Sequence, residues 1–356
     1  ASHNPADWNG MKLVREESRP VSGDSGLDEI RQIAETGRFS EPARRGSISR
    51  VEPFGAYLQH LLGYLDLSAL RPLKVVVNAG NGGAGHVIDG LEQFLPFIFI
   101  KLHHEPDGHF PHGVPNPLLP DSRRVTSEAV VAAGADFGVA WDGDFDRCFL
   151  FDEQGSFIEG YYIVGLLAQA MLSRTPGARI IHDPRLVWNT QDVVRSHGGI
   201  PVQSKTGHAF IKERMRAEDA AYGGEMSAHH YFRDFAYCDS GMLPWLLVAG
   251  IISVTRKPLS TLVAERIARF PCSGEINREV RDPEAVLKAV RARYAPAAIA
   301  VDETDGLSFE YPQWRFNLRL SNTEALIRLN VESRGDIGLM QRQTAEILTV
   351  VENLSA

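Results

Sequence analysis

Three carboxylates stand at alternate positions of one short segment, in the order Asp142, Gly143, Asp144, Phe145, Asp146, Arg147. Carboxylates with this spacing on a turn can converge on one hard cation through oxygen ligands. An all-oxygen ligand set favours Mg²⁺ over Zn²⁺, and the fork of Arg147 suits the oxygens of a phosphate. A solvated acidic turn is the alternative, but three like charges this close repel one another unless a cation lies among them. The segment therefore predicts a metal site.

Two other metal patterns fit the sequence less well. An EF-hand loop beginning at Asp142 would need glycine where Arg147 stands, and helices on both sides where strands are expected. Four histidines (His103, His104, His109 and His112) lie close together among prolines and glycines, without a helical i, i+4 pair. An ordered loop is favoured there over a zinc site.

Hydroxyl and amide side chains lie between two arginines near the C-terminal end: Arg319, Ser321, Asn322, Thr323 and Arg328. Exposed backbone N–H groups with Ser and Thr hydroxyls can form an anion nest, to which arginine adds positive charge. The segment reads as a phosphate pocket. An ordinary Asn/Ser/Thr turn in a hairpin explains the same residues equally well.

The segment Gly223–His230 combines glycines with Glu225, Ser227 and a histidine pair. A carboxylate can accept hydrogen bonds from two vicinal sugar hydroxyls at once. A surface loop that merely carries two histidines remains the alternative.

A glycine-rich segment, Gly80–Gly85, follows an expected strand and fits the dinucleotide-binding pattern G-x-G-x-x-G, with Glu105 about twenty residues later. That pattern would make the chain a nicotinamide dehydrogenase. However, Glu105 lies in an apparent loop rather than at the end of a second strand, and glycines also serve tight turns without any ligand. The turn explanation is favoured.

The elements that must position these segments alternate between strand and helix. Apolar runs predict strands over 73–77, 97–101, 137–141, 179–182 and 200–204, with amphipathic helices between them. Such alternation indicates an α/β class with tandem, related domains and mixed, mainly parallel sheets. Beyond Pro271 the alternation stops, which predicts a C-terminal α+β domain. We expect four parts: 1–50, 51–156, 157–268 and 269–356.

Composition excludes several classes of protein. The 356 residues hold 37 Lys and Arg against 45 Asp and Glu, a net charge of −8 without a strongly basic segment, so no nucleic-acid partner is expected. No apolar run approaches the ~20 residues of a membrane span, so no membrane partner is expected. Three widely spaced cysteines suit a reducing, cytoplasmic location.

The segments at 142–147, 224–227 and 319–324 occur in order behind Ser2-His3-Asn4-Pro5. This ordered set closely resembles the α-D-phosphohexomutases, in particular the phosphomannomutase/phosphoglucomutase branch. Ala325 departs from the proline usual in the family's phosphate loop. The resemblance implies four domains around a central cleft, with most of the first domain missing upstream of Ala1.

By this resemblance Ser2 is the phosphoserine and, with Asp142, Asp144 and Asp146, a ligand of Mg²⁺. Proton transfer or charge guidance falls to Lys12, Arg147, His208 and His229. Substrate contacts fall to His3, Asn4, Lys205, Glu225, Ser227, Arg319, Ser321, Asn322, Thr323 and Arg328.

The implied reaction is reversible phosphoryl transfer between the 1- and 6-positions of mannose or glucose phosphates. Glucose 1,6-bisphosphate or mannose 1,6-bisphosphate would be the intermediate and activator, and the enzyme is expected to be a monomer. Two alternatives stay open. One is a truncated sugar-phosphate-binding protein with little mutase activity. The other is a phosphoglucosamine mutase, although that branch has Gln where this chain has Met226.

Overall fold

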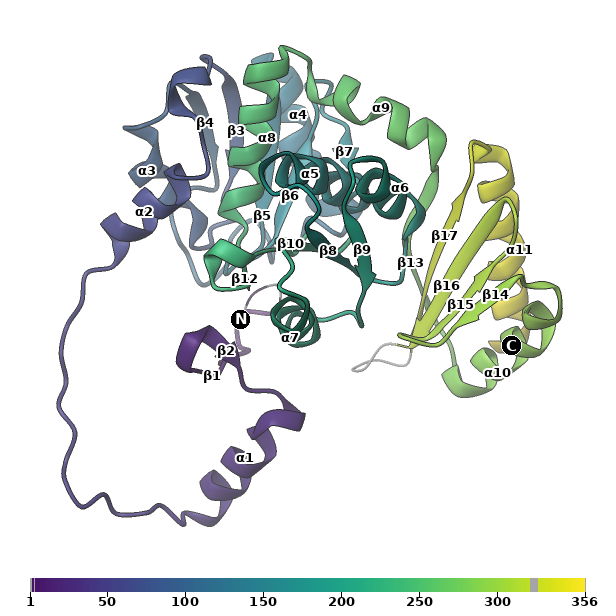
Figure 1. Cartoon of the computed structure of the whole chain (residues 1–356), viewed down its shortest axis with the longest axis horizontal. Coiled ribbons are helices and arrows are strands. Elements are labelled where there is room, and N and C mark those ends of the chain that lie inside the picture. Colours follow the sequence, from purple (N-terminus) through teal and green to yellow (C-terminus); the bar gives the residue numbers. More distant parts are fainter. Residues whose placement is uncertain (1, 3, 321–325, 356) are drawn as a thin grey trace.

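The computed structural model describes residues 2, 4–320 and 326–355. Of the predicted site residues, His3, Ser321, Asn322 and Thr323 therefore lie outside the described residues. The described chain forms an N-terminal segment followed by three sheets, coloured in sequence order in Figure 1.

The N-terminal segment makes few contacts with the rest of the molecule. It contains the two-residue strands β1 (Val14–Arg15) and β2 (Arg19–Pro20), which pair antiparallel, and helix α1 (Leu27–Thr36). No residue of α1 is buried, and residues 38–53 are exposed and form neither helix nor strand. Figure 1 shows this stretch looping away from the body. The hairpin is held where Arg216 Nη2 donates to the Glu17 carbonyl at 2.9 Å.

The first sheet has the strand order β4-β3-β5-β6-β7. The strands β4, β3 and β5 run parallel, whereas β6 and β7 continue antiparallel. The strands are β3 (Lys74–Asn78), β4 (Ile98–Leu102), β5 (Phe137–Trp141), β6 (Cys148–Phe151) and β7 (Phe157–Ile158). The accompanying helices are α2 (Phe54–Leu62), α3 (Ala84–Glu92) and α4 (Arg124–Ala133).

The second sheet repeats this arrangement. Its order is β9-β8-β10-β11-β12, again with three parallel strands followed by two antiparallel ones. The strands are β8 (Arg179–His182), β9 (Ile200–Gln203), β10 (Tyr222–Gly224), β11 (His230–Phe232) and β12 (Cys238–Asp239). The helices are α5 (Gly160–Arg174), α6 (Trp188–Ser196), α7 (His208–Glu218), α8 (Met242–Thr255) and α9 (Leu259–Arg269).

The two α/β units share one hydrophobic core, which runs from Leu58 to Phe270. Helix α8 is apolar almost all round, a pattern that requires burial on every side. Its Trp245 is fully buried and meets the rings of Trp141 and Phe99 from the first sheet. This shared core holds the loops of both sheets in a fixed relation.

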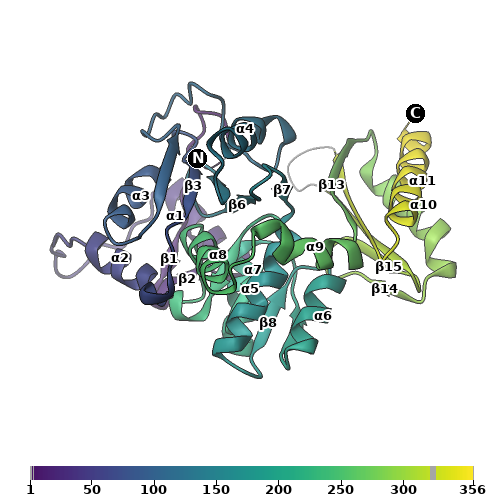
Figure 2. The same cartoon turned by 90° about the horizontal axis from the view of Figure 1, so that it is seen from above.

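The C-terminal unit has its own core and an entirely antiparallel sheet of order β13-β17-β16-β15-β14. Helices α10 (Pro283–Tyr294) and α11 (Ile337–Ser355) cover one face of it, away from the rest of the molecule (Figures 1 and 2). The strands are β13 (Cys272–Glu279), β14 (Ala300–Asp302), β15 (Leu307–Glu310), β16 (Trp314–Leu320) and β17 (Leu326–Ser333).

Short 3₁₀ helices complete the fold: η1 (Glu16–Ser18), η2 (Gly23–Ser25), η3 (Leu67–Ala69), η4 (Pro120–Ser122), η5 (Arg233–Phe235) and η6 (Ala295–Ala297). Among the described residues, no single helix is long and apolar enough to cross a bilayer; α8 and α9 meet that test only as a pair bent by 101°.

The predicted class, tandem α/β units followed by an α+β unit, is confirmed. The strands β1, β2, β11, β12, β14 and β15 were not predicted from the sequence, and β10 was expected to be part of a glycine-rich loop.

Candidate active site

The three carboxylates lie on the turn between β5 and β6, and one oxygen of each falls within 4.8 Å of the others. Asp142 is fully buried, while Asp144 keeps 40 % of its side chain exposed. Arg147, buried beside them, donates from Nε to Asp142 Oδ2 at 2.7 Å. Burial raises the pKa of Asp142, and the nearby Arg147 only partly offsets this. The buried carboxyl group therefore lacks sufficient positive charge around it.

A cationic side chain already contacts this cluster. Lys12 Nζ lies 2.5 Å from Asp146 Oδ2 and 3.3 Å from Asp144 Oδ2. Burial would lower the lysine pKa, but these carboxylates outweigh burial and raise it. The all-oxygen donor set, converging where an ammonium group lies, fits a hard divalent cation such as Mg²⁺.

Ser2 is brought directly to the same cluster. Its Oγ donates to Asp142 Oδ2 at 2.9 Å, across 140 positions of sequence. The backbones here are in close contact: a Cβ on Gly143 would lie 2.4 Å from the Ser2 carbonyl oxygen. The four expected metal ligands, Ser2, Asp142, Asp144 and Asp146, therefore lie in one cluster. Asn4, two residues after Ser2, is exposed.

The glycine-rich segment 80–85 packs closely against the turn that carries the three carboxylates. A Cβ on Gly82 would lie 2.4 Å from the Gly143 carbonyl oxygen, and one on Gly83 would lie 2.7 Å from the Phe145 ring. Gly83 also donates its backbone N–H to the Gly143 carbonyl at 3.0 Å. These glycines allow two backbones to approach closely, which explains the pattern without a dinucleotide.

The four neighbouring histidines of this region have separate partners. The rings of His103 and His112 stack with centroids 3.8 Å apart. His104 pairs with Asp89 at 2.9 Å, and the exposed His109 lies beside Asp107.

The carboxylate turn is joined to the second unit by backbone pairing. Arg147 forms an isolated antiparallel bridge with His229, and Cys148 N–H donates to the Ala228 carbonyl at 3.2 Å. This pairing places the segment 224–229 beside the carboxylates.

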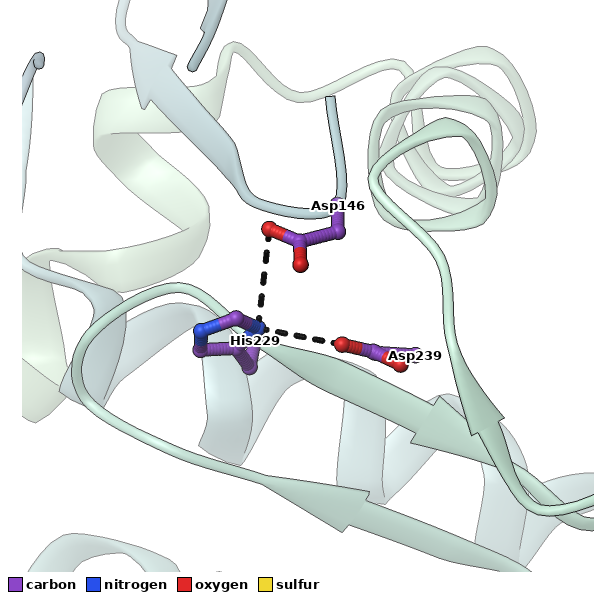
Figure 3. Close-up of side chains that lie close together, drawn as sticks. All are labelled: Asp146, His229 and Asp239. Atoms are coloured by element: carbon purple, nitrogen blue, oxygen red, sulfur yellow. Dashed lines mark ion pairs between the residues drawn. The ribbon is translucent and has the colours of Figure 1, made fainter. Parts of the chain in front are cut away.

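His229 lies between two carboxylates, as Figure 3 shows. Its Nδ1 is 3.3 Å from Asp239 Oδ2 and 3.9 Å from Asp146 Oδ1. Burial would lower the His229 pKa, but Asp239 and Asp146 outweigh it and raise the pKa. Asp239 is also held by Lys212 Nζ at 2.6 Å. His229 is thus suited to hold a proton next to the carboxylate cluster.

His208 has the opposite tendency, because burial and Lys212 lower its pKa. Lys205 lies on the loop just before α7. It is exposed, and its Nζ lies 5.7 Å from the centre of the Phe210 ring.

Glu225 is buried and firmly held. Its two oxygens accept from Gly207 N–H at 2.9 Å and from Tyr231 Oη at 2.6 Å. Ser227 Oγ accepts from Arg185 Nη2 at 3.2 Å.

Arg319 and Arg328 come from neighbouring strands, where they face one another in the register of β16 with β17. Both contact Glu275 of β13, with Nη2 of Arg319 at 3.1 Å and Nη1 of Arg328 at 3.4 Å. The predicted arginine pair is therefore brought together.

Comparison with known proteins accounts for most of the chain. Residues 55–155, 159–270 and 275–350 match the models of phosphoglucomutase/phosphomannomutase domain II, domain III and the C-terminal domain, respectively. The chain belongs to the phosphoglucomutase/phosphomannomutase family. It is a phosphohexomutase-type enzyme.

Similar proteins include a phosphomannomutase of Escherichia coli, 61% identical over 99% of this chain and 79% of that protein. A phosphohexose mutase of Xanthomonas campestris is 59% identical over 98% of this chain and 78% of that protein. The crystal structure of a phosphoglucomutase/phosphomannomutase family protein from Burkholderia thailandensis superposes with a TM-score of 0.86. It is 30% identical, covering 99% of this chain and 75% of that one.

Several residues at this candidate site were not found from the sequence: Asp183, Arg185, Tyr231, Asp239 and Glu275. One signal was available, because Asp183 and Arg185 directly follow β8. The carboxyl ends of parallel strands meet at one edge of a sheet, so polar residues there are candidates for a site. Glu275 and Asp239 carried no such signal.

Proposed function

We propose that this chain transfers a phosphoryl group reversibly between the 1- and 6-positions of mannose and glucose phosphates. A phosphorylated Ser2 and a hexose 1,6-bisphosphate are the intermediates of the proposed reaction. The observation that carries the proposal is the position of Ser2 Oγ, which is hydrogen-bonded to Asp142 beside two further carboxylates.

In the proposed first step, a sugar hydroxyl attacks the phosphorus of phospho-Ser2. The new sugar O–P bond forms as the Ser2 Oγ–P bond breaks. The hydroxyl proton passes to a base of the enzyme, and Ser2 Oγ leaves as an oxyanion that takes up a proton. His229, in contact with Asp146, is the candidate that the geometry favours for receiving that proton, whereas Lys12, held as an ammonium group by the same carboxylate, supplies positive charge. The bisphosphate then reorients so that its two ends exchange places. Ser2 Oγ next attacks the other phosphoryl group, whose bond to the sugar oxygen breaks.

The carboxylates Asp142, Asp144 and Asp146, with an oxygen of phospho-Ser2, would hold Mg²⁺, whose charge offsets the negative charge of the transferring group. The buried Arg147 places a further fixed positive charge beside Ser2. Phosphoryl transfer depends mostly on such positioning and charge.

The far end of the sugar phosphate would be held by Arg319 and Arg328, with Ser321, Asn322 and Thr323 completing the pocket. Glu225 and Ser227, with Lys205, His208 and Asn4, would contact the sugar. In the proposed reaction these groups hold the sugar phosphate whichever end of the sugar faces Ser2.

Intact-mass spectrometry after incubation with glucose 1,6-bisphosphate and Mg²⁺ tests the proposal. We expect one added phosphate, mapped to Ser2, and its loss in Ser2→Ala. The matched control is Ser49→Ala, in the exposed segment 38–53, which should keep the phosphate. Absence of any phosphate on the wild-type chain, or unchanged turnover by Ser2→Ala, would rule the mechanism out.

Sugar preference is tested separately, with mannose, glucose and glucosamine 1-phosphates compared by kcat/KM. We expect turnover of the first two and little of the third. A clear preference for glucosamine phosphate would place the chain in the hexosamine branch instead.

A further inference from the structure

Glu275 stands at the joint between the second α/β unit and the C-terminal sheet. It lies just beyond Gly274, whose φ of +67° requires glycine, and the pairing of β13 with β17 shifts register between Cys272 and Glu275. Such irregularities redirect a side chain out of the regular pleat. Here the redirected side chain is only 17% exposed.

Three arginines from three different segments meet at this one carboxylate. Glu275 Oε2 contacts Arg185 Nη1 at 3.3 Å and Arg319 Nη2 at 3.1 Å, while Oε1 contacts Arg328 Nη1 at 3.4 Å. Each contact is single and rather long, unlike the paired, shorter bonds of an arginine committed to one carboxylate.

Each of the three arginines also keeps a donor for another partner. The Nε atoms of Arg185, Arg319 and Arg328 are buried and have no hydrogen-bond partner among the described residues. A buried donor without a partner is costly, which favours an additional acceptor at this place.

The arginines would repel one another without the carboxylate. The charge of Arg185 lowers the pKa of Arg319, as does burial, whereas Glu275 opposes both effects. Glu275 itself is partly desolvated, but the three arginines outweigh this and lower its pKa. One carboxylate thus holds three positive charges at close range.

Arg185 extends this connection to the proposed sugar-binding segment. Its Nη2 lies 2.8 Å from Asp183 Oδ2, 3.2 Å from Ser227 Oγ and 3.7 Å from Glu225 Oε1. The proposed sugar-contacting residues and the proposed phosphate-binding arginines therefore meet through Arg185 and Glu275.

We propose that Glu275 is a positioning residue for substrate phosphate. It holds Arg319 and Arg328 together, in contact with Arg185, so that a phosphate arrives at preassembled donors. This inference rests on the proposed function, since it takes the two arginines as the phosphate site. Glu275 does not touch the transferring group, so its loss should weaken binding more than it slows the chemical step.

The test compares Glu275→Gln with Glu279→Gln, an exposed carboxylate on the same strand. For Glu275→Gln we expect KM for the hexose phosphate to rise at least about tenfold, as loss of a largely buried charge pair implies. We expect kcat to change less than about threefold. The inhibition constant of inorganic phosphate should rise with KM, and Glu275→Asp should restore part of the loss.

Two results would overturn the inference. Unchanged KM and phosphate inhibition in Glu275→Gln would show that the carboxylate does not position the arginines. Tighter phosphate binding in that variant would show that Glu275 competes with the substrate instead. Thermal unfolding of each variant, and retained phosphate inhibition in Glu275→Asp, separate a folding defect from loss of positioning. If wild type and Glu279→Gln were both inactive, the proposed function would fail rather than this inference.

Discussion

The two charge clusters of the site are built in opposite ways. The carboxylates Asp144 and Asp146 have Lys12 as their counter-ion, beside Asp142, which pairs with Arg147, and the arginines around Arg319 have Glu275. Lys12 comes from an N-terminal segment with few contacts and keeps 52% of its side chain exposed. Glu275 belongs to a sheet strand and keeps only 17% exposed. The lysine is therefore placed to give way to another cation, whereas the glutamate is fixed.

The pKa shifts of Asp142 and Glu275 also differ between the two clusters. Burial raises the pKa of Asp142, although Arg147 opposes it. Burial also acts on Glu275, but three arginines outweigh it and lower its pKa. Asp142 thus lacks offsetting positive charge, although His229 and Lys12 outweigh burial at Asp146 and lower its pKa, while the arginine cluster already holds its negative charge. This contrast matches a site that takes up a metal ion at one side and shares donors with a phosphate at the other.

The largest expected effect is that of metal removal. Chelation with EDTA should lower mutase turnover by at least about 10³-fold, because the offset charge is worth several kcal/mol in the transition state. Added Mg²⁺ should restore turnover, and a coupled assay measures both. Full activity after exhaustive chelation would contradict metal binding by the three carboxylates.

Gly82→Ala should cost about 10²-fold in turnover, the effect of roughly 1 Å of displacement at a reacting group. The added Cβ would lie 2.4 Å from the backbone of Gly143, which cannot yield without moving the carboxylate turn and Ser2. Gly108→Ala is the matched control, since no atom lies within 4 Å of its Cβ. Equal turnover by both variants would contradict the supporting role of the glycine segment.

Lys12→Met should tighten Mg²⁺ binding by about three- to tenfold, because the metal ion no longer competes with an ammonium group, an effect that solvent keeps modest. Titration calorimetry measures the dissociation constant directly. The exposed Lys288, far away on α10, supplies the control variant Lys288→Met. Weaker Mg²⁺ binding in Lys12→Met would mean that the lysine helps to build the metal site.

The smallest effect concerns acid stability at the arginine cluster. The Glu275 pKa is lowered in the folded state, so its contribution to the free energy of unfolding is present above its ordinary pKa of about 4.3. That contribution is lost as pH falls through the lowered value. Wild type and Glu275→Gln should therefore differ by about 1 kcal/mol at pH 6 and converge as pH falls below about 4. Urea unfolding at several pH values measures this, and a difference independent of pH would contradict the assigned charge contacts.

Most of the scaffold could be predicted because its strands are apolar runs between turn residues. Strands β5 and β8 have the predicted bounds, since every residue of Phe137–Trp141 and all but one of Arg179–His182 are buried. Strand β14 was missed because Ala300–Asp302 is an edge strand with all three residues exposed and no buried face. Its pairing with β15, rather than its own sequence, makes it a strand.

From the residues alone, the candidate site was predictable only where its residues are close in sequence; Ser2, 140 positions from Asp142, was assigned by the family resemblance. The carboxylate turn could be recognised because its three ligands share one segment. Glu275 could not, because Arg185 is 90 positions away and Arg319 is 44 positions away. Asp239 next to His229 likewise depends on the antiparallel pairing of β11 with β12. Only the folded sheet brings such charges together.

The exposed stretch 38–53 has a consequence for how the proposed nucleophile, Ser2, is attached. The residues before it contact the body through Ser2, Lys12 and the Glu17 carbonyl, all without a covalent bond. Extended, exposed backbone is where proteases cut first. A single cut there would place Ser2 and the carboxylates on two separate polypeptides. Among the described residues, reversible contacts would then hold the two parts together, so the proposed phosphate carrier could dissociate from the carboxylates on dilution.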